Sequence, residues 1–228
     1  MFLINTFDPL AIRYNCNNVL ESMHVSESIA LMLQPPMFFL EGLGRSKFLD
    51  FTQLLVKLVL ATDMSKHAEI LGAFNAKYAA GGGFNMDLAP DRHLALQLII
   101  KSADLSNAAR PWEVAKMWAE RVTSEFFNQG DKERAAGIPV SMFMDRATTN
   151  IPKMQISFGD AVVRPLMEAM MKLVPDTEEI ITTLKENSLK WQTLFHDASS
   201  SSRSSSGSIS TIPPPPQPQP QPQPTQSY

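Results

Sequence analysis

Apolar residues recur every three or four positions along most of the chain up to about residue 196, which is the spacing of amphipathic helices. No segment alternates between apolar and polar residues over enough positions to indicate a strand. The pattern predicts helices within 1–34, over 48–60, up to Asp104, from Trp112 to a terminal Gly130, through 155–163 and over 177–195. The predicted fold class is therefore all-α.

The composition of the chain changes once, after residue 196. A serine-rich run over 199–210 leads to four consecutive prolines and repeated Gln-Pro pairs. Such a segment has little apolar surface to bury, so residues 197–228 are predicted to be a disordered tail with polyproline II character. We interpret the tail either as a solvated extension or as a ligand for an SH3- or WW-type partner. Residues 1–196 then form one domain.

The net charge and the cysteine content limit which partners and which cellular compartment are expected. A net charge of −3 gives no general attraction to nucleic acid or to acidic membranes. No apolar run approaches the roughly 18 residues that a membrane-spanning helix needs. The single cysteine, Cys16, excludes an intrachain disulfide and fits a reducing compartment. We therefore expect a cytoplasmic protein.

One acidic residue stands at the end of a strongly apolar stretch. Asp104 follows this stretch, and Asn107 comes three residues later, so both can lie on the same helical face. A carboxylate buried after an apolar run is costly unless it is paired, hydrogen-bonded or bound to a metal. The residues alone leave two interpretations open: a helix cap or ion-pair partner, and a metal ligand.

A second pair of residues has the chemistry of a base-binding site. Gln155 and Phe158 are three positions apart, so on a helix they point the same way. A purine fits such a pair, because it offers a flat face for stacking and an edge that pairs with an amide donor and acceptor. Spacing alone favours the interpretation of Phe158 as an ordinary core residue.

Several motifs together resemble a known family. They are KSADLSN at 101–107, a tryptophan-bearing helix followed by EFFNQGDKE at 125–133, TDMSKH at 62–67 and QISF at 155–158. In their order along the chain these motifs resemble the class I cyclic nucleotide phosphodiesterases, and the likeness runs from Phe2 to about Leu194. The resemblance implies a compact helical catalytic fold of the HD type. It also implies hydrolysis of 3′,5′-cyclic nucleotides to 5′-monophosphates, with cAMP favoured and cGMP as an alternative.

The resemblance assigns roles to named positions. It implies that Asp104 is a metal ligand. It implies a substrate pocket in which Phe158 and Val122 clamp the base, lined also by Asn107, Gln155, Phe126, Leu105 and Met64. Four residues are implied to support the metal site without being metal ligands themselves: Glu21, His24, Asp63 and His67. Without the resemblance, Met64 would be assigned to core packing, and Glu21 and His24 to a helix surface.

The resemblance also shows what this sequence lacks. Family members hold two divalent ions, Zn²⁺ and Mg²⁺ or Mn²⁺, through an H-N-x-x-H motif and an H-D pair, and neither motif occurs ahead of these segments. His196-Asp197 has the H-D letters, but we interpret it as a frayed helix end. We therefore expect an N-terminally truncated phosphodiesterase domain whose metal ligands are incomplete. The alternative is a non-catalytic protein that binds cyclic nucleotides or another protein.

Two further expectations follow from this organisation. In the loop that covers the pocket of family members, the usual Pro-Met before Asp is replaced by Met142-Phe143-Met144, which changes the expected pocket lining. Helices that lack their upstream neighbours should expose apolar faces, so this chain alone is expected to be poorly soluble or oligomeric.

Overall fold

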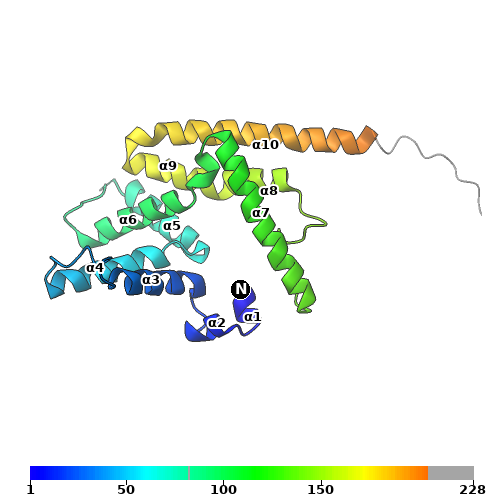
Figure 1. Cartoon of the computed structure of the whole chain (residues 1–228). Helices are drawn as coiled ribbons and strands as arrows, with labels where there is room; N and C mark the ends of the chain where they lie inside the picture. The colour runs from blue at the N-terminus through cyan, green and yellow to red at the C-terminus, as the bar shows by residue number, and fades with distance from the viewer. Residues whose placement is uncertain (82, 205–228) are drawn as a thin grey trace, which may run out of the picture.

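The computed structural model describes residues 1–81 and 83–204, and every regular element in these residues is helical (Figure 1). The elements are α1 Phe2–Asn5, α2 Pro9–Arg13, α3 Val19–Met32, α4 Arg45–Leu60, η1 Met64–Lys66, α5 His67–Ala79, α6 Ala89–Asp104, η2 Ser106–Ala109, α7 Trp112–Ala135, α8 Ile151–Phe158, η3 Gly159–Val163, α9 Arg164–Leu173, η4 Pro175–Thr177 and α10 Glu178–Ser204. The predicted all-α fold is confirmed.

The core lies where α5, α6, α9 and α10 meet. One buried cluster joins α5, α6 and α9 through Phe74, Leu98, Leu166 and Ala169. A second cluster joins η3, α9 and α10 through Val163, Met167, Ile181 and Leu184. Because burial of apolar side chains is the main favourable term in folding, these clusters fix the helices that carry the candidate site.

Helices α3 and α4 pack beside each other, and α4 also packs on α6 (Figure 1). None of the residues of α4 is buried. Large apolar side chains are exposed on and around this pair, among them Leu20, Leu31, Leu33, Phe39 and Leu49. This end of the molecule therefore presents the kind of apolar surface that usually marks an interface.

The structure corrects the predicted end of the tryptophan-bearing helix. Helix α7 continues to Ala135, and Gly130 is buried inside it. The glycine is needed for packing, because a Cβ at this position would lie 1.9 Å from the backbone oxygen of Met144. The loop after α7 therefore packs directly on the backbone of the helix.

The structure also corrects the predicted end of the last helix. Helix α10 continues to Ser204, beyond the predicted end at residue 195, so the predicted domain boundary at residue 197 lies inside the helix. The disorder of the tail stays a prediction. The Ser200 hydroxyl donates a hydrogen bond to the Asp197 carbonyl at 2.9 Å, a local bond that serine can make without leaving the helix. The Pro-Gln repeats lie outside the described residues. Within the described part of the chain, none of the helices has the length and apolar character needed to cross a membrane.

Candidate functional site

A cavity of about 950 Å³ opens between the end of α6, the exposed face of α7 and the helical turns of α8 and η3. The segment η2 and the side chains of Met64 and Phe143 complete its walls. Its lining is mainly apolar, with a few carboxylate, amide and guanidinium groups among the apolar side chains. This combination of apolar walls and a few polar groups is typical of a site for a small organic molecule.

The structure brings the predicted metal and substrate residues to this one cavity. Asp104 lines it, together with all seven predicted substrate residues: Met64, Leu105, Asn107, Val122, Phe126, Gln155 and Phe158. These residues come from four stretches that are far apart in the sequence. The fold therefore gathers them, while their individual roles stay predictions.

Helix α7 supplies one wall of the cavity. Val114, Trp118, Val122 and Phe126 line it at intervals of four residues, which places them on one face of the helix. Trp118 is 46% exposed, and the guanidinium carbon of Arg121 lies 5.7 Å from the centre of a Trp118 ring. Sequence reasoning missed Trp118, although its helical register with Val122 could have identified it.

Helix α8 supplies the opposite wall. The Asn150 side chain caps its first turn by accepting a hydrogen bond from the Lys153 amide at 2.9 Å. The helix then passes into a π-helical turn, η3, which also borders the cavity. Such turns are often found at functional sites. Phe158 also packs against the buried cluster of η3, α9 and α10, so both interpretations of this residue, core and pocket, hold.

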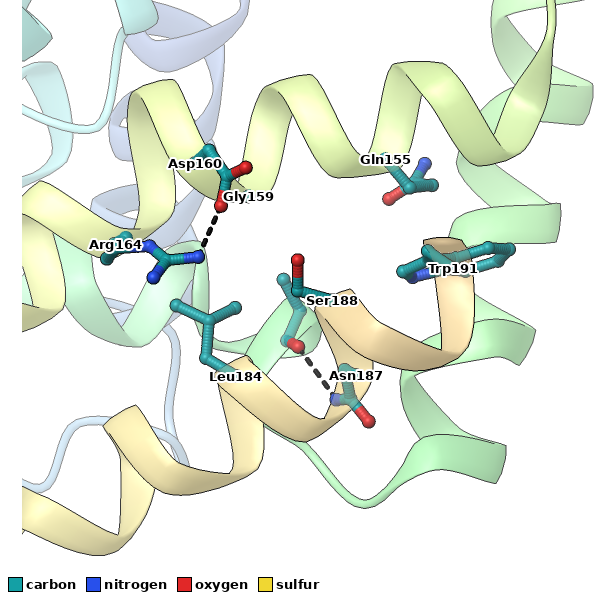
Figure 2. A pocket seen from close by; sticks show the side chains of 9 residues that line it. Gln155, Gly159, Asp160, Arg164, Leu184, Asn187, Ser188 and Trp191 are labelled. Atoms are coloured by element: carbon teal, nitrogen blue, oxygen red, sulfur yellow. Dashed lines mark hydrogen bonds and ion pairs between the residues drawn. The ribbon is translucent and has the colours of Figure 1, made fainter. Parts of the chain in front are cut away.

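Gln155 lies between the large cavity and a second, small pocket on its α10 side. The small pocket, of about 20 Å³, is lined by Asn187, Ser188 and Trp191 (Figure 2). The Asn187 amide donates hydrogen bonds to the carbonyls of Ala108 at 3.0 Å and Arg110 at 2.8 Å. Through these bonds α10 holds η2, the segment that carries Asn107 on the cavity wall.

The loop after α7 is anchored to that helix. The Ser141 amide and hydroxyl donate hydrogen bonds to the Glu133 carboxylate at 2.7 and 2.8 Å. Arg134 and Asp145 form an ion pair at 3.0 Å. Burial alone would raise the pKa of Glu133, but the hydrogen bonds from Ser141 and Gln129 bring this pKa below its ordinary value. These contacts hold the segment from which Phe143 lines the cavity.

The electrostatics around Asp104 are set by its burial and by two neighbours, Lys101 and His24. Burial raises the pKa of Asp104, and Lys101 and His24 oppose this rise in part. Lys101 is fully buried and donates from Nζ to three backbone carbonyls at the end of α4. Burial lowers the pKa of Lys101, and the charges of Asp104, Asp63 and Glu21 counter this effect. Sequence reasoning missed Lys101, whose signal is a lysine inside an apolar run, one turn before Asp104.

The four predicted supporting residues do not line the cavity. Asp63 accepts a hydrogen bond from the Asn18 amide at 2.6 Å and another from the Ser65 backbone at 2.7 Å. Burial alone would raise the pKa of Asp63, but these hydrogen bonds and the nearby Lys101 lower it. His67 begins α5, and burial and the charge of Lys101 lower its pKa.

The other two supporting residues, Glu21 and His24, belong to α3. Glu21 acts electrostatically on Lys101, and His24 acts on Asp104. Glu21 therefore lies near Lys101 and His24 near Asp104, but neither residue reaches the cavity wall, and their predicted supporting roles stay predictions.

The residues present do not fit a metal pair. Within 1–81 and 83–204, no group of three or more His, Cys, Asp or Glu side chains could hold a metal ion. Asp104 is therefore a candidate ligand without the partners that a structural or catalytic metal requires. We assign no chemical step through a metal to these residues.

Comparison with known proteins places the chain in a family. Residues 1–184 match the family described as 3'5'-cyclic nucleotide phosphodiesterase. The 3',5'-cyclic-AMP phosphodiesterase 4C of Rattus norvegicus is 36% identical over 198 residues, covering 84% of this chain and 37% of that protein. The probable 3',5'-cyclic-AMP phosphodiesterase pde-4 of Caenorhabditis elegans is 38% identical over 198 residues, covering 84% of this chain and 29% of that protein.

A solved structure shows the same fold. The structure of LmjPDEB1 in complex with IBMX superposes with a TM-score of 0.78 at 33% sequence identity, covering 86% of this chain and 59% of that chain. The chain belongs to the 3'5'-cyclic nucleotide phosphodiesterase family. It spans well under half the length of the two relatives described above. The family and the fold expected from the sequence motifs are confirmed.

Proposed function

We propose that this chain forms the nucleotide-binding part of an enzyme that hydrolyses 3',5'-cyclic nucleotides to 5'-monophosphates. The observation that carries the proposal is the convergence of Asp104 and seven predicted substrate residues on one cavity. We favour cAMP over cGMP, because two similar proteins are named as cyclic-AMP phosphodiesterases.

The cavity walls suit the base and the cyclic phosphate of a cyclic nucleotide. Phe158 on α8 and Val122 on α7 offer an aromatic and an aliphatic surface between which a base can stack. The Gln155 and Asn107 amides each offer a donor and an acceptor to the base edge. Asp104, at the end of α6, marks the part of the cavity toward which the cyclic phosphate would lie.

The metal requirement defines what the described residues do not supply by themselves. The proposed activity calls for two divalent ions, Zn²⁺ and Mg²⁺ or Mn²⁺, whose Lewis-acid chemistry would have to be held by ligands outside the described residues. We propose Asp104 as one ligand of such a pair. The remaining ligands are not among the described residues, so hydrolysis requires groups that these residues do not provide.

A turnover assay tests the proposal. Release of 5'-AMP from cAMP is measured with the purified chain in Mg²⁺ and trace Zn²⁺, beside Asp104→Ala and a control, Asp87→Ala, at an exposed position outside the cavity. Turnover that Asp104→Ala abolishes and Asp87→Ala leaves intact would support hydrolysis with Asp104 in the working site, and would show that groups outside the described residues complete the metal ligands. Turnover that survives Asp104→Ala would contradict this role.

A second function, non-catalytic binding of a cyclic nucleotide, is favoured by one observation, the lack of a three-ligand metal group in the described residues. Binding of cAMP without turnover would support this second function. The absence of both binding and turnover would reject both functions.

The cellular setting is also a proposal. The single exposed cysteine, Cys16, fits a reducing compartment, and we propose the cytoplasm. The net charge of −3 argues against nucleic acid as a partner. Binding of an SH3- or WW-type domain to the Pro-Gln repeats stays a prediction about residues outside those described.

A further inference from the structure

Lys101 makes an unusual set of contacts for a lysine. Its side chain is fully buried on α6. The ammonium nitrogen lies 3.2 Å from the Ala61 carbonyl, 3.2 Å from the Thr62 carbonyl and 3.0 Å from the Asp63 carbonyl. The three donors of one ammonium group thus meet three consecutive acceptors, 38 to 40 residues away in the chain.

These contacts explain why a charged side chain is tolerated in the interior. Burial of an ammonium ion is costly unless hydrogen bonds and opposing charge replace its water. The carbonyls it binds follow the last residue of α4, Leu60, where the helix dipole is negative and favours a cation. The charges of Asp104, Asp63 and Glu21 also favour the protonated form.

The contacts connect two walls of the candidate site. Asp104 lies three residues after Lys101, one turn along α6 and on the same face. Met64, which also lines the cavity, directly follows the three bound carbonyls. Asp63 is in turn held by the amide of Asn18, at the start of α3. One buried side chain therefore fixes α6 against the segment that presents Met64.

We propose that Lys101 is a positioning residue, which sets the place of the 61–64 segment, and hence of Met64, relative to Asp104. Its effect on ligand affinity rests on the proposed function, since that part assumes that a cyclic nucleotide occupies the cavity. Its effect on the place of Met64 does not depend on the ligand.

The test compares two lysines that both bridge helices. Lys77 on α5 forms an ion pair with the buried Asp91 of α6 at 2.9 Å, and neither residue lines the cavity. Lys101→Leu and Lys77→Leu should therefore both lower the melting temperature. If Lys101 positions the site, only Lys101→Leu should change the cavity.

Two readouts at a temperature where all variants are folded separate positioning from stability. The first is the ¹³C-methyl resonance of Met64, with Met154 on the opposite wall as internal reference. We expect Lys101→Leu to shift the Met64 signal and Lys77→Leu to leave it unchanged. The second is the Kd of cAMP, which Lys101→Leu should raise by about tenfold. This is the effect of losing one well-placed contact.

The outcomes distinguish this proposal from the proposed function. An unchanged Met64 signal and cAMP affinity in Lys101→Leu, with a loss of stability like that of Lys77→Leu, would show that Lys101 is only structural. Failure of the parent chain to bind cAMP would count against the proposed function, while the Met64 signal would still decide the positioning role.

A second variant keeps the test decisive if Lys101→Leu does not fold. The amide nitrogen of Lys101→Gln keeps two donors but ends one bond short of Nζ, so it cannot reach all three carbonyls in place. A shifted Met64 signal in Lys101→Gln supports positioning. A signal that matches the parent chain overturns it.

Discussion

Replacing Gly130 by alanine should reverse the usual effect of that substitution in a helix. Glycine in a helix interior is about 1 kcal/mol less favourable than alanine, so the exchange ordinarily stabilises. At Gly130, however, the new Cβ would stand 1.9 Å from the Met144 carbonyl oxygen and 2.7 Å from its carbon. Both atoms belong to the backbone, so the loop itself has to move.

The size of the effect follows from this geometry. Contacts shorter than 3.0 Å are essentially never seen for a Cβ, so the loop must retreat by about 1 Å. Overpacking of this kind costs about 1–3 kcal/mol, and the retreat also strains the Ser141–Glu133 hydrogen bonds. Because the propensity gain of about 1 kcal/mol offsets part of this cost, we expect a net loss of stability of up to about 2 kcal/mol. For a chain of this size, each kcal/mol corresponds to about 2–4 °C in melting temperature.

The matched control is Gly72→Ala. Gly72 is an exposed residue inside α5, and a Cβ there would meet nothing within 4 Å. Urea denaturation and thermal melting of both variants measure the difference. Gly72→Ala should gain up to about 1 kcal/mol, and Gly130→Ala should lose stability. A Gly130→Ala variant that gains as much as Gly72→Ala would refute the packing of the loop on α7.

Three further changes have defined outcomes. The pKa of Glu133 in the folded chain lies below its ordinary 4.5, so its carboxylate stabilises the fold above pH 4.5, and this contribution is lost as the pH falls through the folded pKa. Glu133→Gln should therefore flatten the acid side of a curve of stability against pH, and an unchanged curve would contradict this. Asn187→Ala leaves two backbone carbonyls without their donor and should lower the free energy of unfolding by about 1–3 kcal/mol, as measured by denaturant titration. An unchanged free energy of unfolding would show that these hydrogen bonds contribute little. Leu31 on α3 and Leu49 on α4 are about half exposed, so we expect their surface to drive association. The double variant Leu31→Lys/Leu49→Lys should then lower the mass measured by light scattering toward that of the monomer. A parent chain that is already monomeric would contradict this expectation.

Periodicity and motifs were enough to predict the helical class and eight of the residues that line the cavity. Helical spacing places Val122 with Phe126 and Gln155 with Phe158, because side chains three or four residues apart share a face. The motifs then indicated which faces belong to a common site. Trp118 was open to the same reasoning, since it lies in register with Val122 on α7.

Features that depend on contacts between distant segments were not predictable. Lys101 binds carbonyls about 40 residues away, and its local sequence does not reveal which acceptors it meets. Gly130 has the character of a helix-ending residue, and only the approach of Met144 shows why it lies inside α7. The end of α10 was also misplaced, because a serine-rich composition does not show that the last turns extend a helix already held by packing.

The central claim is that the cavity between α7 and α8 binds a cyclic nucleotide by stacking its base on Phe158. Calorimetric titration of cAMP into the chain and into Phe158→Leu tests it directly, since leucine keeps an apolar contact with the neighbouring core but has no ring. Loss of a base–aromatic stack costs about 1–3 kcal/mol, so the Kd should rise by roughly 5- to 150-fold while the melting temperature changes little. Equal affinity in the two proteins, or no binding to the parent chain, would contradict the account.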